Sequence, residues 1–255
     1  MEHIQSERDG NLSILTLSRG KANALNFALV EELCGAVAAA AADDSVRGLV
    51  LASNRPRFFS SGFDIREVFG YDREGMSAFF GRFIDLYEGL YHCPKPVVAA
   101  LSGHTFAGGA ILAIACDFRI MAEGDFGFAM NEINLGLALS PTMRSMLMNA
   151  AGLVPAREIM LFGEPLTPAR ALEIGLVREL APAEQVRDRA VSCARALAAK
   201  PPAAYRAMKQ SLQELGARPD LSSDICSDRT TLDQFLDTWF SAEAQEARRA
   251  VASKF

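Results

Sequence analysis

Apolar positions in the first half of the chain alternate between short runs and longer helical patterns. Apolar residues on one face predict a helix over 27–42, and the run Gly48–Ala52 is typical of a strand buried on both faces. The same patterns predict helices over 76–91 and 108–115, strands over 95–101 and 118–122, and a hairpin turn at Asp9-Gly10-Asn11. Such alternation of strands and helices predicts an α/β architecture with buried strands and right-handed crossovers.

After about residue 140 the strand patterns fade and helical spacing dominates. The predicted helices cover 141–151, 155–162, 183–199, 202–215, 228–240 and 243–252. An apolar stripe in this part of the chain offers a surface for another subunit or for the chain itself, and consists of Leu232, Phe235, Leu236 and Trp239.

Composition and charge narrow the class of protein. The 255 residues are 50% hydrophobic and 22% charged, which suits a globular chain with a sizeable core. The net charge is −5 and no Lys/Arg-rich run is present, so nucleic acid is not the expected partner. A phosphate-bearing ligand could still meet local basic residues such as Lys21, Arg66 and Lys95.

Cysteine and histidine usage points to a protein with neither disulfides nor a metal. Five widely spaced cysteines predict reduced thiols in the cytoplasm, namely Cys34, Cys93, Cys116, Cys193 and Cys226. The three histidines have no metal-ligand spacing, and the polar N-terminus shows no signal peptide. The uncharged stretch Pro96–Cys116 is long enough for a membrane span, but its central glycines favour a strand, a turn and a helix instead.

Three glycine-containing segments could carry chemistry. Phe58–Ile65 follows a predicted strand, and Gly103–Ala110 joins a strand to an apolar helix, where unpaired amides favour negative charge. The third, Phe126–Gly136, places Glu132 among apolar residues, and burial would raise its pKa toward neutrality. Taken one at a time, the segments also fit an ordinary turn, close helix packing and a solvated loop carboxylate.

Several familiar sites are excluded by their missing motifs. The sequence has no GxxxxGK phosphate loop and no GxGxxG dinucleotide fingerprint. A serine hydrolase would need a GxSxG-like elbow, and Ser60-Ser61-Gly62 lacks that frame. His104 is expected to be a turn residue, not a catalytic base.

In their order and spacing, these segments resemble the crotonase (enoyl-CoA hydratase/isomerase) superfamily over essentially the whole chain. The residues that carry the resemblance are Lys21–Leu25, Phe59–Ile65, Lys95–Ala100, Gly103–Ala110, Ala115–Arg119, Phe126-Gly127, Gly163-Glu164 and Gly175–Val177. The resemblance implies an α/β spiral core of ββα units, assigned to residues 1–195, and a C-terminal helical trimerisation region over 196–255. It also implies an acyl-CoA thioester as substrate, no membrane partner, and a homotrimer or homohexamer.

The resemblance assigns site residues as well. It places two oxyanion-hole amides on Phe63 and Gly108. It implies that CoA, which enters as part of the substrate and not as a separate cofactor, lies along two segments. These contribute Lys21, Ala22, Ala24 and Leu25, and Ser61, Phe63, Asp64, Ile65 and Arg66.

One departure from the family pattern bears on the reaction. Family hydratases carry a glutamate three residues beyond the oxyanion glycine, where this chain has Ile111. The other family glutamate matches Glu132. A single base suffices to move a double bond from C3 to C2, whereas hydration needs two groups to activate water and to protonate C2. The sequence therefore favours a Δ3–Δ2 enoyl-CoA isomerase. A hydratase, another crotonase-type reaction, and a noncatalytic CoA-binding scaffold are the alternatives.

Overall fold

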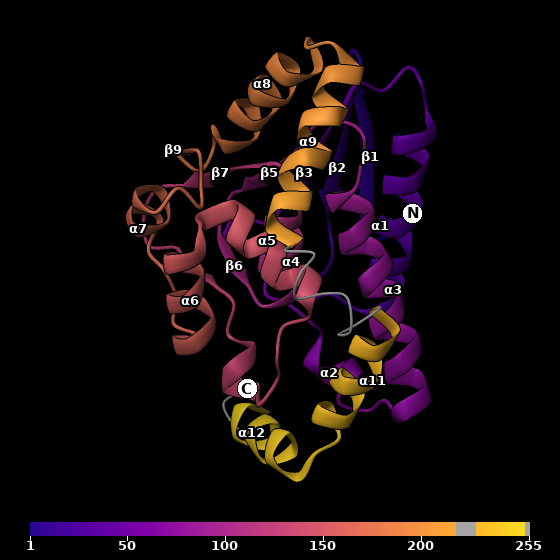
Figure 1. Cartoon of the computed structure of the whole chain (residues 1–255), viewed down its shortest axis with the longest axis vertical. Coiled ribbons are helices and arrows are strands. Elements are labelled where there is room, and N and C mark those ends of the chain that lie inside the picture. Colours follow the sequence, from indigo (N-terminus) through magenta and orange to yellow (C-terminus); the bar gives the residue numbers. More distant parts are fainter. Residues whose placement is uncertain (218–227, 253–255) are drawn as a thin grey trace.

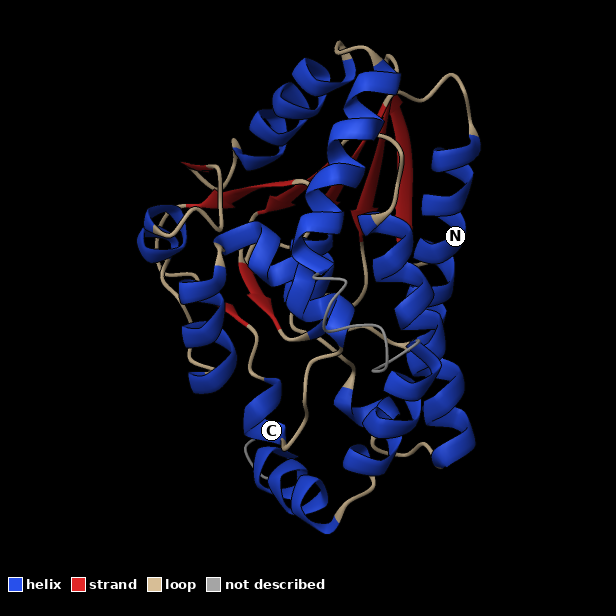
Figure 2. Cartoon of the chain, in the orientation of Figure 1, coloured by secondary structure: helices blue, strands red, loops and turns tan. Residues whose placement is uncertain are grey.

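A six-stranded sheet forms the centre of the computed structural model, which describes residues 1–217 and 228–252 (Figures 1 and 2). Its strand order is β1-β2-β3-β5-β7-β9, and only the β1–β2 hairpin is antiparallel. The strands are β1 (Ile4–Asp9), β2 (Leu12–Leu17), β3 (Gly48–Ser53), β5 (Val97–Leu101), β7 (Phe118–Ala122) and β9 (Glu179–Ala181). The predicted hairpin and the three predicted buried strands are confirmed.

A second, three-stranded parallel sheet lies beside the first. Its order is β4-β6-β8, formed by β4 (Phe58–Ser60), β6 (His104–Phe106) and β8 (Phe128–Ala129). Each strand follows one of the larger sheet and leads to a helical segment, so strand, strand and helix repeat three times along the chain. The segments are α2 (Ile65–Val68) with α3 (Arg73–Tyr91), then α4 (Gly108–Ala115), and then the 3₁₀ helix η1 (Glu132–Leu135). This repeat is the ββα unit that the family resemblance implies.

The two faces of the large sheet carry separate apolar layers. Leu49 and Leu51 belong to the cluster under α1 (Phe27–Ala42), α3 and α4. Val50 and Ala52, which point the other way, pack under α8 (Val186–Ala198). Because both faces are covered, the β3 run is continuously apolar instead of alternating.

The second half of the chain is mainly helical, as predicted, with one exception. Its helices are α5 (Pro141–Ala151), α6 (Leu153–Phe162), α7 (Pro168–Glu173), α8, α9 (Pro202–Ala217), α11 (Asp228–Trp239) and α12 (Ala242–Ala252). The exception is β9, a strand beyond residue 140 that pairs with β7. Three residues are too few to show a periodicity, so only the tertiary pairing defines this strand.

One further expectation needs correction, and one alternative that the sequence left open is decided. His104 was expected in a turn but lies in strand β6. Its Nδ1 accepts a hydrogen bond of 3.0 Å from Gly127 N. The apolar stripe of α11 packs within the chain, since Phe235 stacks on Phe80 with centroids 3.5 Å apart and Trp239 is buried. Those side chains are therefore unavailable to another subunit.

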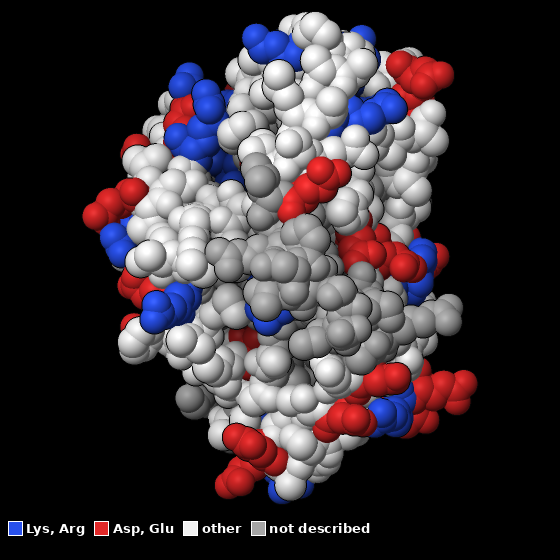
Figure 3. All heavy atoms as spheres, in the orientation of Figure 1, with Lys and Arg blue, Asp and Glu red and all other residues white. Residues whose placement is uncertain are grey.

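Other expectations are met or stay predictions. Cys34, Cys93, Cys116 and Cys193 are free thiols, whereas Cys226 lies outside the described residues. None of the helices in the described ranges is long and apolar enough to cross a membrane. Acidic and basic side chains are interspersed over the face in Figure 3. The division between residues 195 and 196 falls inside α8 and stays a prediction.

Candidate functional site at the ends of the small sheet

The three segments singled out in the sequence converge because each follows one strand of the small parallel sheet. Carboxyl ends of parallel strands lie at the same edge, and β4, β6 and β8 are neighbours there. Residues 61–64 follow β4, Ala107 and Gly108 follow β6, and residues 130–132 follow β8. Since β6 is the central strand, the Gly108 segment lies between the Phe63 and Glu132 segments.

Residues 22–25 run alongside residues 61–64. Ser61 N donates to Ala22 O at 3.0 Å, Leu25 N donates to Gly62 O, and Asp64 N donates to Leu25 O, the last two at 2.8 Å. Because this parallel bridge uses the groups on either side of Phe63, the amide of Phe63 itself is directed away from Leu25. Within the described residues that amide donates to no acceptor.

The first amide of α4 is also unpaired. Gly108 is the first residue of the helix, where backbone N–H groups have no partner in the helix itself. The preceding Ala107 has φ 46° and ψ −123°, an unfavourable conformation for alanine. Its own N–H donates to Ala129 O at 2.8 Å, and its ψ sets the direction of the Gly108 amide. The strained residue thus orients the predicted oxyanion donor.

Glycines allow the two amide-bearing segments to touch. A Cβ on Gly62 would lie 2.9 Å from Ala107 Cβ and 3.4 Å from Gly108 N. A Cβ on Gly109 would lie 2.6 Å from Ser60 Cβ. Neither position has room for a side chain, so the backbones approach as closely as an oxyanion hole requires.

Glu132 begins η1 and is held by later parts of the chain. Asn134 Nδ2 donates to Gly163 O at 3.1 Å, which ties η1 to the end of α6. Gly136 ends η1 in the left-handed region with φ 70°, and a Cβ there would lie 3.3 Å from Ala244 Cα in α12. The loop that carries Glu132 is therefore fixed on both sides.

The Glu132 carboxylate is buried without a partner. The residue is 9% exposed, and neither Oε1 nor Oε2 has a hydrogen-bond partner in the described chain. Burial raises the pKa of Glu132 from 4.5 to about 7. A carboxylate with such a pKa can both accept and return a proton near neutral pH.

The remaining predicted residues divide into core, structural and exposed positions. Ile111 lies one turn after Gly108 on α4 and is buried. Asp64 pairs with Arg19 at 2.7 Å and caps α2 by accepting from Arg66 N, which suits a structural role. Lys21 and the Arg66 side chain are exposed, and Ala22, Ala24, Ser61 and Ile65 are half-buried.

Lys95 does not join the site. It precedes β5, at the opposite end of the sheet, and its Nζ donates to Ala40 O and Asp43 O. The suggestion that Lys95 serves a phosphate there is therefore wrong.

Sequence reasoning missed two residues that shape the site. Asn23 is buried with φ 48°, and its side chain accepts from Arg19 N and donates to Phe59 O and Ser53 Oγ. The sequence carries a signal for Asn23, because asparagine tolerates positive φ better than most residues. Ala107 gave no such signal, since nothing about alanine in the sequence suggests positive φ.

The raised pKa of Glu132 predicts a pH-dependent gain in stability for Glu132→Gln. The folded protein keeps this proton up to pH about 7, whereas the unfolded glutamate loses it near 4.5. The free energy of unfolding of the wild type therefore falls by up to about 3 kcal/mol as the pH rises from 4.5 to about 7. Urea unfolding should show that Gln gains most relative to the wild type at pH 8 and loses most of that advantage at pH 5. Glu164→Gln, at an exposed position, is the control, and a pH-independent difference for Glu132→Gln would contradict the prediction.

A family model described as enoyl-CoA hydratase/isomerase matches residues 7–249. The crystal structure of human mitochondrial delta3-delta2-enoyl-CoA isomerase superposes with a TM-score of 0.90. The match has 25% sequence identity and covers 99% of this chain and 97% of that one. Together these matches confirm the crotonase-like fold class expected from the sequence.

Sequence relatives include both reaction types. Enoyl-CoA delta isomerase 1 of Rattus norvegicus is 28% identical over 74% of this chain, which spans just under two thirds (66%) of that relative's length. A probable enoyl-CoA hydratase of Bacillus subtilis is 32% identical over 100% of this chain and 97% of its own. Sequence similarity therefore identifies the family but does not distinguish isomerase from hydratase. That distinction has to be argued from the residues of the site.

Proposed function

Because the chain belongs to the enoyl-CoA hydratase/isomerase family, we propose that it converts a 3-enoyl-CoA into the 2-enoyl-CoA. Family membership implies an acyl-CoA substrate. The observation that supports isomerisation is the carboxylate of Glu132, the one buried carboxylate among the described residues, which has a pKa of about 7 and follows the strand next to the one that leads to the Gly108 amide. Ile111 occupies the position of the second family acid, and its side chain has no ionisable group that could transfer a proton.

In the proposed mechanism Glu132 is the only proton carrier. The ionised carboxylate removes a proton from C2, and the electron pair of that C–H bond moves toward the thioester oxygen. The amides of Phe63 and Gly108 stabilise the resulting dienolate. The protonated Glu132 then returns the proton to C4 and the double bond comes to lie between C2 and C3, so atoms and charge balance.

A hydratase is the second candidate, supported by the full-length similarity to the Bacillus subtilis protein. A two-substrate assay separates the candidates. The purified protein is given a 3-enoyl-CoA and a 2-enoyl-CoA of equal chain length. Isomerisation should be faster than hydration. Faster hydration would show that a water site exists without an acid at residue 111, and the proposal would be abandoned.

Replacing Ile111 with glutamate should give measurable hydration of a short 2-enoyl-CoA. Residue 111 lies one helical turn beyond Gly108, so a carboxylate there would share the site with Glu132. We expect a small gain, because like charges in a dry site raise each other's pKa and the surroundings are not arranged for water. Ile111→Gln, which adds a polar group of the same size without an acid, is the matched control. Equal hydration by the two variants would show that the added acid is not responsible.

We also propose a trimer or a dimer of trimers. With the α11 stripe buried, the apolar surface available to another copy lies elsewhere, chiefly on α6. Leu153, Val154, Leu161 and Phe162 there are 60–76% exposed. A monomer would leave these four apolar side chains in water. The cytoplasmic location stays a prediction.

Light scattering should give three or six times the 27.6 kDa mass of the chain. Phe162→Asp should shift the protein toward the monomer, because it would bury an unpaired charge in the contact. Gln5→Asp places the same charge at an exposed position of β1 and should leave the mass unchanged. A stable wild-type monomer at micromolar concentration would contradict the prediction.

A further inference from the structure

Another polar group that is buried without a partner, besides Glu132, carries a charge and lies outside the residues proposed for catalysis. Arg248 in α12 is 8% exposed, and its Nη1 makes no hydrogen bond within the described part of the chain. Its guanidinium instead stacks on the ring of Trp239, 4.1 Å from the centroid, and approaches Phe69 at 5.5 Å. Burial lowers the pKa of Arg248 below its ordinary value. A guanidinium in this setting calls for an anionic partner.

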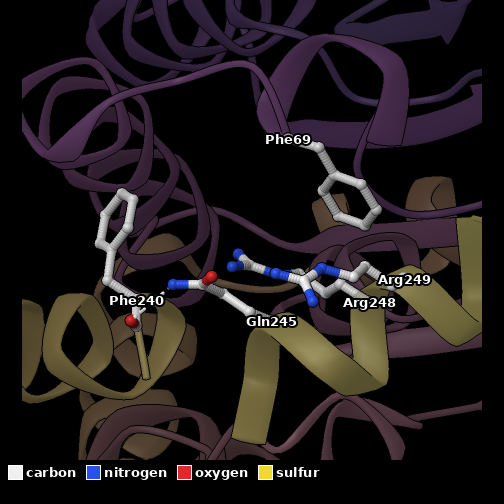
Figure 4. Close-up of a pocket in the computed structure, with 5 residues that line it drawn as sticks. All are labelled: Phe69, Phe240, Gln245, Arg248 and Arg249. Atoms are coloured by element: carbon white, nitrogen blue, oxygen red, sulfur yellow. Dashed lines mark hydrogen bonds between the residues drawn. The ribbon is translucent and has the colours of Figure 1, made fainter. Parts of the chain in front are cut away.

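The arginine lines a pocket of about 340 Å³, which is in the size range of small-molecule sites. The pocket is lined by Phe69, Phe240, Gln245, Arg248 and Arg249, and Figure 4 shows the polar side chains between the two phenylalanine rings. Gln245 is fixed, since its Nε2 donates to Phe240 O at 2.9 Å. The pocket thus combines aromatic walls with positive charge.

The position of this pocket relates it to the reacting atoms. Phe69 ends α2, which begins two residues after Phe63. The opposite wall is α12, which packs against η1 through Ala244 and Gly136. One wall therefore continues from the segment of the oxyanion amide and the other is in contact with the segment of Glu132.

We propose that this pocket binds a carboxylate at the distal end of the acyl chain, so that the substrate is the CoA thioester of a dicarboxylic acid. This substrate class rests on the acyl-CoA activity proposed above. Aromatic walls suit the hydrocarbon chain, and the guanidinium of Arg248, which lines the pocket beside Arg249, suits a carboxylate.

The test measures binding, so that it does not depend on which reaction the enzyme performs. Isothermal titration compares saturated, unreactive CoA thioesters in pairs of six, eight and ten carbons, each pair with and without a terminal carboxylate. We expect the wild type to bind the dicarboxylic member about tenfold to a hundredfold more tightly at one length at least. Arg248→Met should remove this preference and leave the binding of the monocarboxylic thioester within a few-fold. Arg157→Met, the same change at an exposed position of α6, should keep the preference.

Two further arms identify the source of the anion and guard against misfolding. Pantetheine thioesters, which lack the CoA nucleotide, should show the same preference. Arg248→Lys keeps the positive charge and should retain part of the preference for the dicarboxylic thioester. Circular dichroism checks that each variant is folded. No preference in the wild type at any length overturns the proposal, as does an equal loss for both members of a pair in Arg248→Met. Failure of 3-enoyl-CoA isomerisation would overturn the proposed function alone, because the binding preference is measured separately.

Discussion

Glu132→Gln should lower isomerisation by about 10²–10⁴-fold, the usual loss when a general base is removed. Glutamine keeps the shape of the side chain but cannot accept the C2 proton. In the described chain no other carboxylate combines burial with a pKa raised toward neutrality. Binding of a saturated acyl-CoA should survive within a few-fold, since the amides of Phe63 and Gly108 are untouched. Steady-state kinetics and isothermal titration measure the two quantities.

Two controls separate loss of the base from general damage to the site. Glu132→Asp keeps a carboxylate one methylene further back and should retain part of the activity. Glu164→Gln changes an exposed glutamate and should behave as the wild type. Near-normal isomerisation by Glu132→Gln would mean that another group moves the proton, and the assignment of Glu132 would fail.

Gly62→Ala should lower kcat by about 10²–10³-fold, comparable with the loss of one oxyanion donor. Gly62 has φ +88°, and its new methyl group would meet Ala107 Cβ at 2.9 Å and Phe106 O at 3.1 Å. The segment that carries Phe63 would have to move away from the one that carries Gly108. Both amides could then no longer point to one thioester oxygen, so the transition state would lose more stabilisation than the bound substrate.

Gly175→Ala is the matched control for backbone strain. Gly175 has a similar φ of +76°, but a Cβ there has no neighbour within 4 Å. Both variants should lose stability in urea unfolding, because alanine is unfavourable at positive φ, and only Gly62→Ala should lose kcat. Equal losses of kcat in the two variants would show that strain matters and the close approach does not.

Much of the fold could be predicted because the patterns are long. The helix over 27–42 begins and ends where its apolar spacing does, with Asn26 accepting a hydrogen bond from Leu29 N as the cap. The start of α3 was placed three residues late, since Asp72 caps the helix ahead of the first apolar residue, Met76. The short strands of the second sheet were missed, because two or three residues carry no periodicity.

The candidate site was predictable in its residues and less in how they come together. The segments with Phe63, Gly108 and Glu132 could be named from the sequence, through the family resemblance. That they meet depends on the pairing of β4, β6 and β8, which no local pattern shows. The apolar neighbours of Glu132 did predict its raised pKa. The pocket beside Arg248 could not be read from neighbouring residues, because its walls come from α2 and from α12, far apart along the chain.

The contact between α12 and η1 bears on how the protein is made. Helix α12 begins at Ala242, 110 residues after Glu132, and Ala244 closes the space beside Gly136. During synthesis on the ribosome, the strands that orient the two amides emerge long before the helix that supports the base. A nascent chain therefore acquires the α12 side of the support for Glu132, its proposed proton carrier, last. Proteolytic trimming behind Phe240 would leave η1 held on the α6 side alone, through Asn134 and Gly163.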